Sequence, residues 1–316
     1  MSLTGAPADV TVAISTRQRA DALSRCLHAI GRGTVQPRAI VVVDQSDDDG
    51  TERVVREHAA AGLPLRYERM AALGLGASQN VAVRSTSSTF VAVTDDDCIV
   101  DERWLEAVMR AFASDPALDV VTGRVLPLPA EGERTWPVSL RESTTRALFA
   151  AHAPPWDVGS GNNFTVRRAT FLRIGGCDER LGPGSPARGG VDMDLFYRLL
   201  RAGARIRYEP DAIVRHERQD YAARLARRPM YGRGMGSMVS LRLRDGDAGA
   251  VGLFTSWMAL RLRLLARALV RGDRRTAREE LVMLRSTLGG VAHGLGAPGA
   301  GPTPDSAATS RVARSG

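Results

Sequence analysis

Phe90-Val91-Ala92-Val93-Thr94-Asp95-Asp96-Asp97 is the stretch from which the fold of this 316-residue chain can be worked out. Its apolar residues predict a buried strand, and adjacent carboxylates end that strand abruptly. Neighbouring carboxylates repel one another, and a divalent cation such as Mg²⁺ or Mn²⁺, which prefers hard oxygen ligands, would relieve the repulsion. The alternative is a solvated acidic turn, because acidic residues are also favoured at a helix N-terminus.

Strands and helices alternate on both sides of this stretch. Expected strands cover residues 10–14, 40–43, 65–68, 90–93, 118–125, 163–167 and 206–208, and expected helices cover residues 19–30, 51–61, 75–84, 104–112, 168–174 and 192–202. Alternation of this kind predicts a parallel sheet covered by helices. Ligands bind such sheets at the carboxyl ends of the strands. Asp44 also follows a predicted strand, so it should share a crevice with the acidic cluster, unless it belongs only to a turn.

The composition suits a large α/β domain with anionic partners. Hydrophobic residues make up 44% of the chain and aromatic residues only 5%, so the core must be mainly aliphatic. All 43 basic residues are arginine, and the formal net charge is +8. A basic surface favours phosphates, a membrane surface or nucleic acid, but it can equally be a solvated surface without a partner.

The cysteines and the N-terminal residues predict a cytoplasmic protein. Cys26, Cys98 and Cys177 form no C-x-x-C pattern, so they indicate neither a zinc site nor a disulfide framework. The first residues lack the basic and apolar segments of a secretory signal. No run of about 18 apolar residues predicts a membrane-spanning helix.

Several motifs, taken in order, resemble family 2 of the inverting glycosyltransferases, which have a GT-A fold. The resemblance covers about residues 10–216. It is carried by Val12-Ala13-Ile14-Ser15-Thr16-Arg17, Val42-Val43-Asp44-Gln45-Ser46, Asp95-Asp96-Asp97, Gly161-Asn162-Asn163-Phe164, the run from Gly175 to Leu195, and residues 211–216. Each motif alone is weak, whereas the ordered set is specific.

The resemblance implies a domain organisation. Residues 1–217 would form an α/β domain of the GT-A type, a mixed sheet flanked by helices, with a nucleotide-binding half at about 1–100 and an acceptor and catalytic half at 101–217. Residues 218–296 would form an Arg-rich helical extension. Residues 297–316, rich in Gly, Pro, Ala and Ser, are expected to be disordered.

The resemblance also implies a role for each motif residue. The implied catalytic base is Asp192, and the implied cofactor is Mn²⁺ or Mg²⁺. Donor-binding residues would be Ser15, Thr16, Arg17, Asp44 at the nucleobase, Asp95 and Asp96 near the ribose, Asn162 and Asn163; metal ligands would be Asp97, Asp95 and His216. The implied reaction moves a sugar, with inversion, from a nucleotide-diphosphate donor, by default a UDP-sugar, to a hydroxyl acceptor in a glycan, a glycolipid or a natural product.

Each of these roles has a plainer structural alternative. Asn162 and Asn163 could form a tight turn, since Asn tolerates left-handed geometry. Asp192 could only cap the helix that begins there, and His216 could be an ordinary structural histidine. Two departures from the family pattern also matter: Val191 stands where the family usually has Glu, and Gly74 occupies a region where some relatives place a basic residue.

Val191 raises a competing function, a non-catalytic protein that binds a nucleotide sugar or a glycan on the same fold. A nucleotide-sugar pyrophosphorylase is a poorer fit, because Ser15-Thr16-Arg17-Gln18-Arg19 contains no Gly for a phosphate loop. A dinucleotide-dependent oxidoreductase is disfavoured, because no G-x-G-x-x-G follows the first strand.

The Arg-rich C-terminal region predicts an amphipathic helix. Met258, Leu262, Leu265 and Leu269 share one face, whereas Arg263, Arg267 and Arg271 lie on another. Such a helix could lie on an anionic membrane, which would place the protein peripherally on the inner membrane face. The alternative is a helix packed on the domain with solvated arginines. No nucleic-acid partner is expected, because the region has few aromatics and no nucleic-acid module.

Overall fold

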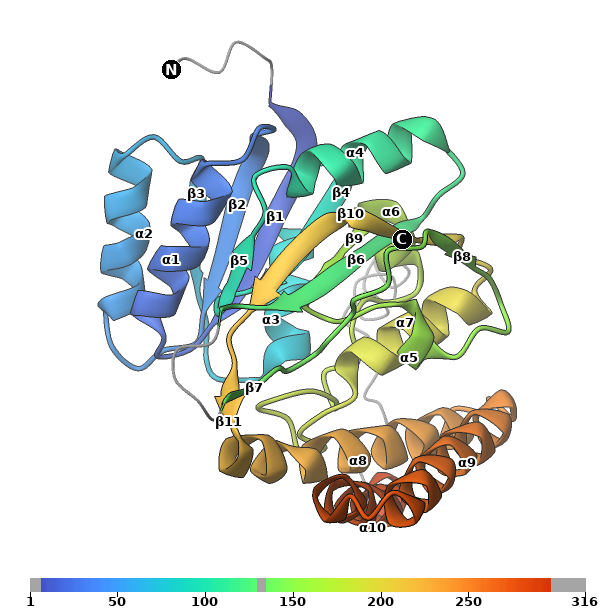
Figure 1. Ribbon diagram of the computed structural model, residues 1–316. Coiled ribbons are helices and arrows are strands. Elements are labelled where there is room, and N and C mark those ends of the chain that lie inside the picture. Colours follow the sequence, from blue (N-terminus) through green and yellow to red (C-terminus); the bar gives the residue numbers. More distant parts are fainter. Residues whose placement is uncertain (1–6, 130–134, 297–316) are drawn as a thin grey trace, which may run out of the picture.

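The computed structural model describes residues 7–129 and 135–296 and shows a sheet flanked by helices (Figure 1). The predicted tail, residues 297–316, lies outside the described residues. The strands are β1 (Ala8–Thr16), β2 (Pro37–Asp44), β3 (Leu65–Arg69), β4 (Phe90–Asp95), β5 (Cys98–Val100), β6 (Val120–Pro127), β7 (Thr135–Trp136), β8 (Ala147–Phe149), β9 (Phe164–Arg167), β10 (Ile206–His216) and β11 (Gln219–Asp220). The helices are α1 (Ala20–Gly31), α2 (Gly50–Ala60), α3 (Leu75–Arg84), α4 (Trp104–Ser114), α5 (Pro155–Val158), α6 (Arg168–Arg173), α7 (Val191–Arg201), α8 (Tyr221–Arg244), α9 (Gly249–Val270) and α10 (Arg274–Gly296).

The main sheet has nine strands and is mixed, which confirms the predicted fold class. Its order is β3-β2-β1-β4-β9-β6-β10-β5, and β8 also pairs with β10. β1 to β4 run parallel, as the alternation predicted. The expectation of a wholly parallel sheet is wrong, because β9 enters antiparallel between β4 and β6, and β5 and β8 run antiparallel to β10. Two expected strands at 206–208 and 211–216 form the single β10, whose register shifts between Glu209 and Ile213.

The two faces of the sheet carry separate cores because successive side chains of a strand point to opposite faces. Val10, Val12 and Ile14 of β1 belong to a core cluster that includes residues of α1 and α4. Ala13, between them, belongs to the other cluster, which includes residues of α3, α6 and α7. The sheet is therefore buried on both sides, as its continuous apolar strands predicted.

The helices α8, α9 and α10 form a layer below the sheet in the view of Figure 1. Glycines let the backbones of α8 and α10 touch: a Cβ atom added to Gly236 would lie 2.0 Å from the Thr287 carbonyl oxygen, and one added to Gly290 would lie 2.2 Å from the Arg233 carbonyl oxygen. Within the described residues, every helix is too short or too polar to span a bilayer.

The α8 helix also contacts the loop that leads into α7. A Cβ atom added to Gly234 would lie 2.3 Å from the carbonyl carbon of Gly189, and one added to Gly190 would lie 2.7 Å from the Gly234 carbonyl oxygen. Gly190 has φ +87°, a left-handed conformation that suits glycine. Backbone therefore packs on backbone immediately before Asp192, and the helical layer fixes where α7 begins.

Candidate active site

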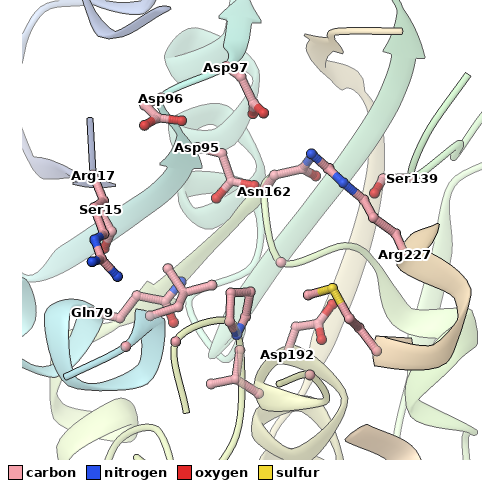
Figure 2. Close-up of a pocket in the computed structure, with 18 of the residues that line it drawn as sticks. Ser15, Arg17, Gln79, Asp95, Asp96, Asp97, Ser139, Asn162, Asp192 and Arg227 are labelled. Atoms are coloured by element: carbon pink, nitrogen blue, oxygen red, sulfur yellow. The ribbon is translucent and has the colours of Figure 1, made fainter. Parts of the chain in front are cut away.

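A cavity of about 510 Å³ lies at the carboxyl ends of β1 and β4, where the parallel strands predicted a ligand site. Helix α8 and the loop before α7 complete its walls (Figure 2). The predicted residues that line it are Ser15, Thr16, Arg17, Asp95, Asp96, Asp97, Asn162, Asp192 and His216. The structure thus brings together segments that lie up to 200 residues apart in the sequence. Asp44 and Asn163 are the two predicted site residues that do not line the cavity.

Four side chains gather where β4 and β10 end and β5 begins. Ligand atoms of Asp95, Asp97, Cys98 and His216 all lie within 4.8 Å of one another. The antiparallel pairing of β5 and β10 places His216 opposite Cys98, which explains how the histidine reaches the acidic cluster. His216 Nε2 lies 3.4 Å from Asp97 Oδ1, a buried oxygen that has no hydrogen-bond partner within the described residues.

These side chains suit a hard divalent cation. His216 Nδ1 lies 2.8 Å from the Glu217 carbonyl oxygen, which can only accept a hydrogen bond. Nδ1 therefore donates this hydrogen bond, and Nε2 is the ring nitrogen that faces the Asp97 carboxylate and could bind a cation. Burial, reinforced by Asp95 and Asp97, raises the pKa of the Cys98 thiol, and soft sulfur suits Mn²⁺ or Mg²⁺ less well than carboxylate oxygen does. Two carboxylates and one imidazole remain, a set that fits Mn²⁺ or Mg²⁺.

Asp96 differs from Asp97 because both of its carboxylate oxygens accept hydrogen bonds, whereas Asp97 Oδ1 has no partner within the described residues. Thr16 Oγ1 donates to Asp96 Oδ2 at 2.7 Å, and Arg19 Nη1 donates to Asp96 Oδ1 at 3.2 Å. The same guanidinium nitrogen lies 2.8 Å from Asp97 Oδ2. Burial and the neighbouring carboxylates Asp97 and Asp96 raise the pKa of Asp95. Arg19 pairs directly with Asp96 and Asp97, and its charge also opposes the increase in the pKa of Asp95.

Asp192 lies across the cavity, in the first turn of α7 (Figure 2). The N-cap residue is Gly190, so the alternative that Asp192 occupies the cap position is wrong. Its Oδ1 accepts a hydrogen bond from the Met193 backbone N–H at 2.9 Å. Burial raises the pKa of Asp192, while that hydrogen bond and the charge of Arg141 oppose the increase. A carboxylate with a raised pKa at a cavity wall is suited to accept a proton.

Gly161 provides the space that the Asp192 side chain occupies. A Cβ atom added to Gly161 would lie 2.9 Å from Asp192 Cβ and 3.3 Å from Asp192 Oδ2. Any larger residue at 161 would therefore push the carboxylate from its position. This contact gives a steric reason for the glycine in the Gly161-Asn162-Asn163-Phe164 motif.

Asp194, two residues further along α7, points away from the cavity. It is fully buried, and its carboxylate lies 2.7 Å from Arg198 Nε and 3.3 Å from Arg242 Nε. Arg242 comes from α8, so this ion pair joins α7 to the helical layer. Asp194 does not line the cavity described above, and Asp192 is the carboxylate that α7 presents to the site.

The two predicted asparagines have different environments. The Asn163 amide donates to the carbonyl oxygens of Arg124 at 2.8 Å and Ala212 at 2.9 Å, and its oxygen accepts from Trp104 Nε1 at 2.9 Å. It ties β6, β10 and α4 together, so its hydrogen-bonding capacity is used within the fold, and its expected contact with the donor sugar stays a prediction. Asn162 lines the cavity, and its buried Oδ1 has no partner within the described residues.

Asp44 lies below the cavity wall. It is fully buried, and its carboxylate accepts from Tyr67 Oη at 2.8 Å and from the Ser46 backbone N–H at 2.8 Å. Its neighbour Gln45 lines the cavity instead and hydrogen-bonds through both side-chain atoms to the backbone of Gly74. The expected contact of Asp44 with a nucleobase stays a prediction, since the Tyr67 hydroxyl and the Ser46 N–H already donate hydrogen bonds to its carboxylate.

Several cavity residues escaped the sequence reasoning. Arg19 is the N-cap residue of α1, and Gln79 lies in α3. Arg227 and Tyr231 are one turn apart on α8, and Figure 2 shows the Arg227 side chain extending from that helix towards Asn162. Spacing within α8 gives Arg227 and Tyr231 a common face, but only the packing of α8 shows that this face reaches the site.

Comparison with known proteins agrees with this geometry. The family model described as Glycosyl transferase family 2 matches residues 11–174. Pre-mycofactocin glycosyltransferase of Mycobacterium tuberculosis is 32% identical over 254 residues, which are 77% of this chain and 49% of that protein. The chain therefore spans about half the length of this relative. Glycosyltransferase AglE of Haloferax volcanii is 24% identical over 239 residues, 71% of this chain and 72% of that protein.

Solved structures show the same fold. The mannosyltransferase PcManGT of Pyrobaculum calidifontis, in complex with GDP-Man and Mn²⁺, superposes with a TM-score of 0.60 at 21% identity, over 98% of this chain and 82% of that chain. S. aureus TarS 1-349 in complex with UDP-GlcNAc has a TM-score of 0.58 at 14% identity, over 89% of this chain and 92% of that chain. With the family model matching more than half of its length, the chain belongs to glycosyl transferase family 2.

Proposed function

We propose that the protein transfers a sugar from a nucleotide-diphosphate donor to an acceptor hydroxyl, with inversion at the anomeric carbon. The observation that carries this proposal is a single cavity that has candidate metal-ion ligands on one wall and Asp192 on another. The mycobacterial relative and the solved neighbours, whose names describe glycosyl transfer or bound nucleotide sugars, support it.

Asp192 acts as the general base. Its ionised carboxylate takes the proton of the acceptor hydroxyl as the oxygen attacks the sugar. The Asp194 carboxylate is unavailable for this role, since Arg198 and Arg242 hold it in the core. Val191, which stands where the family usually has Glu, is buried against Gly182 and Gly76, so Asp192 works without an acidic neighbour at position 191.

The nucleotide diphosphate lies against the carboxyl ends of β1 and β4. Ser15, Thr16 and Arg17 contact the nucleotide, and Asn162 uses its free Oδ1 to accept a hydrogen bond from a sugar hydroxyl. Asp95, Asp97 and His216 would hold Mn²⁺ or Mg²⁺. When bound there, the cation would supply positive charge beside the leaving diphosphate. UDP is the first nucleotide to test, with GDP as the alternative.

The outer face of α9 is proposed to contact an anionic membrane. Leu262 and Leu269 are 53% and 63% exposed, and Arg263 and Arg267 are exposed on the same helix. Exposed leucines beside arginines suit insertion at a negatively charged bilayer surface. Met258 and Leu265, the other members of the predicted apolar face, are partly covered.

A screen of nucleotide sugars tests the proposed reaction. The full chain is incubated with UDP- and GDP-sugars, with Mn²⁺, with Mg²⁺ or with EDTA, and release of free nucleotide and sugar is measured with and without added acceptor hydroxyls. We expect at least one donor to be hydrolysed or transferred in a cation-dependent manner. Donors that stabilise the fold against heat but are never turned over would favour a non-catalytic binding protein.

A further inference from the structure

A second cavity, of about 430 Å³, adjoins the first at Asp192. The two cavities share part of their lining, and the residues common to both are Val138, Ser139, Ser160, Gly190, Asp192, Arg227 and Tyr231. The donor requires the cavity that holds the acidic cluster. A group bound in the second cavity would therefore approach Asp192 from the side away from the acidic cluster. If Asp192 is the base, an acceptor hydroxyl must lie beside its carboxylate, and the second cavity provides that place. This step rests on the proposed function.

The second cavity is strongly basic. Five arginines line it, and Asp192 is the only acidic residue among its described lining residues. Arg224 and Arg228 are paired with Glu279, and Arg261 is paired with Glu280. Neither glutamate lines the cavity, so two negative charges are paired with three of the five arginines from outside it.

Arg141 and Arg227 form no salt bridge with a carboxylate in the described part of the chain, although Asp157 and Asp192 act on Arg141 electrostatically without pairing with it. Arg141 donates to the carbonyl oxygens of Trp156 and Gly159. Arg227 is hydrogen-bonded by the Gln219 side-chain oxygen in the amide orientation that satisfies both groups. A half-buried guanidinium without a counterion is costly, and a negatively charged ligand would offset that cost. Arg141 lines only the second cavity, so it separates an effect on this cavity from an effect on the donor.

Rings line the wall beside these charges. Trp156 and Trp257 lie 5.4 Å apart between ring centroids, and the guanidinium of Arg261 lies 4.3 Å from the Trp257 ring centroid. Trp257 is nearly buried, so the half-buried Trp156 presents the accessible face. Tyr231, 43% exposed, lines both cavities, and its hydroxyl makes no hydrogen bond to another described residue. An aromatic face next to free hydrogen-bond donors suits a small ring that carries polar substituents.

We propose that the second cavity binds the acceptor and that this acceptor is a sugar carrying an acidic group, a carboxylate or a phosphate. Arg141 pairs with the acidic group, and Trp156 packs against the ring. The reacting hydroxyl then faces Asp192 at the junction of the two cavities. A neutral sugar would leave Arg141 without a counterion and bind more weakly.

Matched monosaccharides test this specificity by binding alone. Ligand-observed NMR on the full chain compares methyl β-D-glucuronide and glucose 1-phosphate with methyl β-D-glucoside. We expect at least one acidic sugar to bind about tenfold or more tightly than the neutral one, the effect of a charge-assisted hydrogen bond. A response to only one of the two acidic probes identifies the acidic group. Equal affinity for all three, or no binding of either acidic sugar, overturns the proposal.

Variants assign the preference to Arg141. Arg141→Met, which keeps much of the apolar stem, should lose the preference, whereas Arg141→Lys should retain part of it. Arg38→Met is the control, because Arg38 is exposed and lines neither cavity. Affinity for UDP or GDP with Mn²⁺ reports on the fold and on the donor cavity. If Arg141→Met binds nucleotide normally and still prefers the acidic sugar, the assignment is wrong. If the preference follows Arg141 but no donor is ever turned over, the proposed reaction fails and the binding site stands.

Discussion

The two ends of the active-site region have opposite charge and opposite origins. Asp95, Asp96 and Asp97 make one end acidic, and they follow directly from the end of β4. Arg141 and Arg227 make the other end basic, and they come from the segment after β6 and from α8. Local geometry positions the residues at the end of a strand. The residues that a helix from a distant part of the chain contributes depend on which of its faces packs towards the cavity.

Asp192 lies between the acidic end and the basic end, because it lines both cavities. Burial raises its pKa and the positive charge of Arg141 lowers it, so the basic end helps to keep the base ionised. The acidic end instead accumulates charge that raises the pKa of Asp95.

The largest effect is expected where the two ends meet. Asp192→Asn should reduce transfer by at least about 100-fold while donor binding persists, because Asn keeps the size of the side chain but cannot accept the acceptor's proton. Steady-state kinetics and calorimetry with donor and Mn²⁺ measure the two quantities. Near-normal turnover of a folded Asp192→Asn protein would move the base to another residue.

Asp194→Asn is the matched control on the same helix. It removes one charge of a fully buried ion pair with Arg198 and Arg242. We expect a loss of about 3 kcal/mol or more in the free energy of unfolding, with turnover per folded molecule largely unchanged. Denaturant unfolding and kinetics on the folded fraction separate the two outcomes. A catalytic defect without a loss of stability would contradict the assignment of Asp194 to the core.

At the acidic end, Asp97→Ala should abolish the cation-dependent part of donor binding. The substitution removes the unpartnered oxygen that lies closest to His216 Nε2 and one partner of Arg19. Calorimetry of the donor with Mn²⁺ and with EDTA measures the difference. Affinity in Mn²⁺ equal to that of the unsubstituted protein would remove the metal assignment.

Gly161→Ala should lower kcat by about 10-fold or more, since a shift of about 1 Å in a catalytic group can cost up to about 100-fold. The new methyl group would lie 2.9 Å from Asp192 Cβ and displace the carboxylate. Gly252 of α9, whose added Cβ meets nothing within 4 Å, provides the control substitution Gly252→Ala. Unchanged kcat in Gly161→Ala would show that Asp192 has room to adjust.

The pH dependence of kcat/KM should reflect the burial of Asp192. Because burial raises its pKa, protonation begins at a higher pH than the ordinary value of about 3.9. The base is active when ionised, so activity should fall as pH decreases through the raised pKa. The acidic limb of the profile should therefore lie above about pH 4. A limb at or below that value would mean that the ionised carboxylate is better stabilised than its burial implies.

The smallest effect is expected at the outer surface. Leu262→Ser with Leu269→Ser should weaken sedimentation with anionic vesicles, and high salt should weaken binding of the unsubstituted chain. Vesicles of neutral lipid are the control. No binding of the unsubstituted chain to anionic vesicles at low salt would leave α9 as a packed helix with a solvated outer face.

The sequence by itself determined the framework and the acidic end. Apolar runs and helical periodicity placed most strands and helices, and the predicted helix at 75–84 has the same bounds as α3. Local patterns suffice there because burial on both faces demands continuous apolar strands. The same rule puts the acids that follow β4 at the ligand edge. Short elements such as β5 and β7 escaped detection, because two or three residues carry no periodicity.

Only the tertiary structure decided which side chains reach the site. Asp44 and Asn163 sit in motifs like those of their cavity-lining neighbours Gln45 and Asn162, yet both hydrogen-bond within the fold. A shift of one residue turns a side chain to the other side of the chain, and the choice depends on what packs there. The arginines of α8 depend likewise on how glycines let that helix approach α7 and α10. Sequence periodicity predicts which residues share a face of a helix, whereas long-range packing decides which of those faces lines a site.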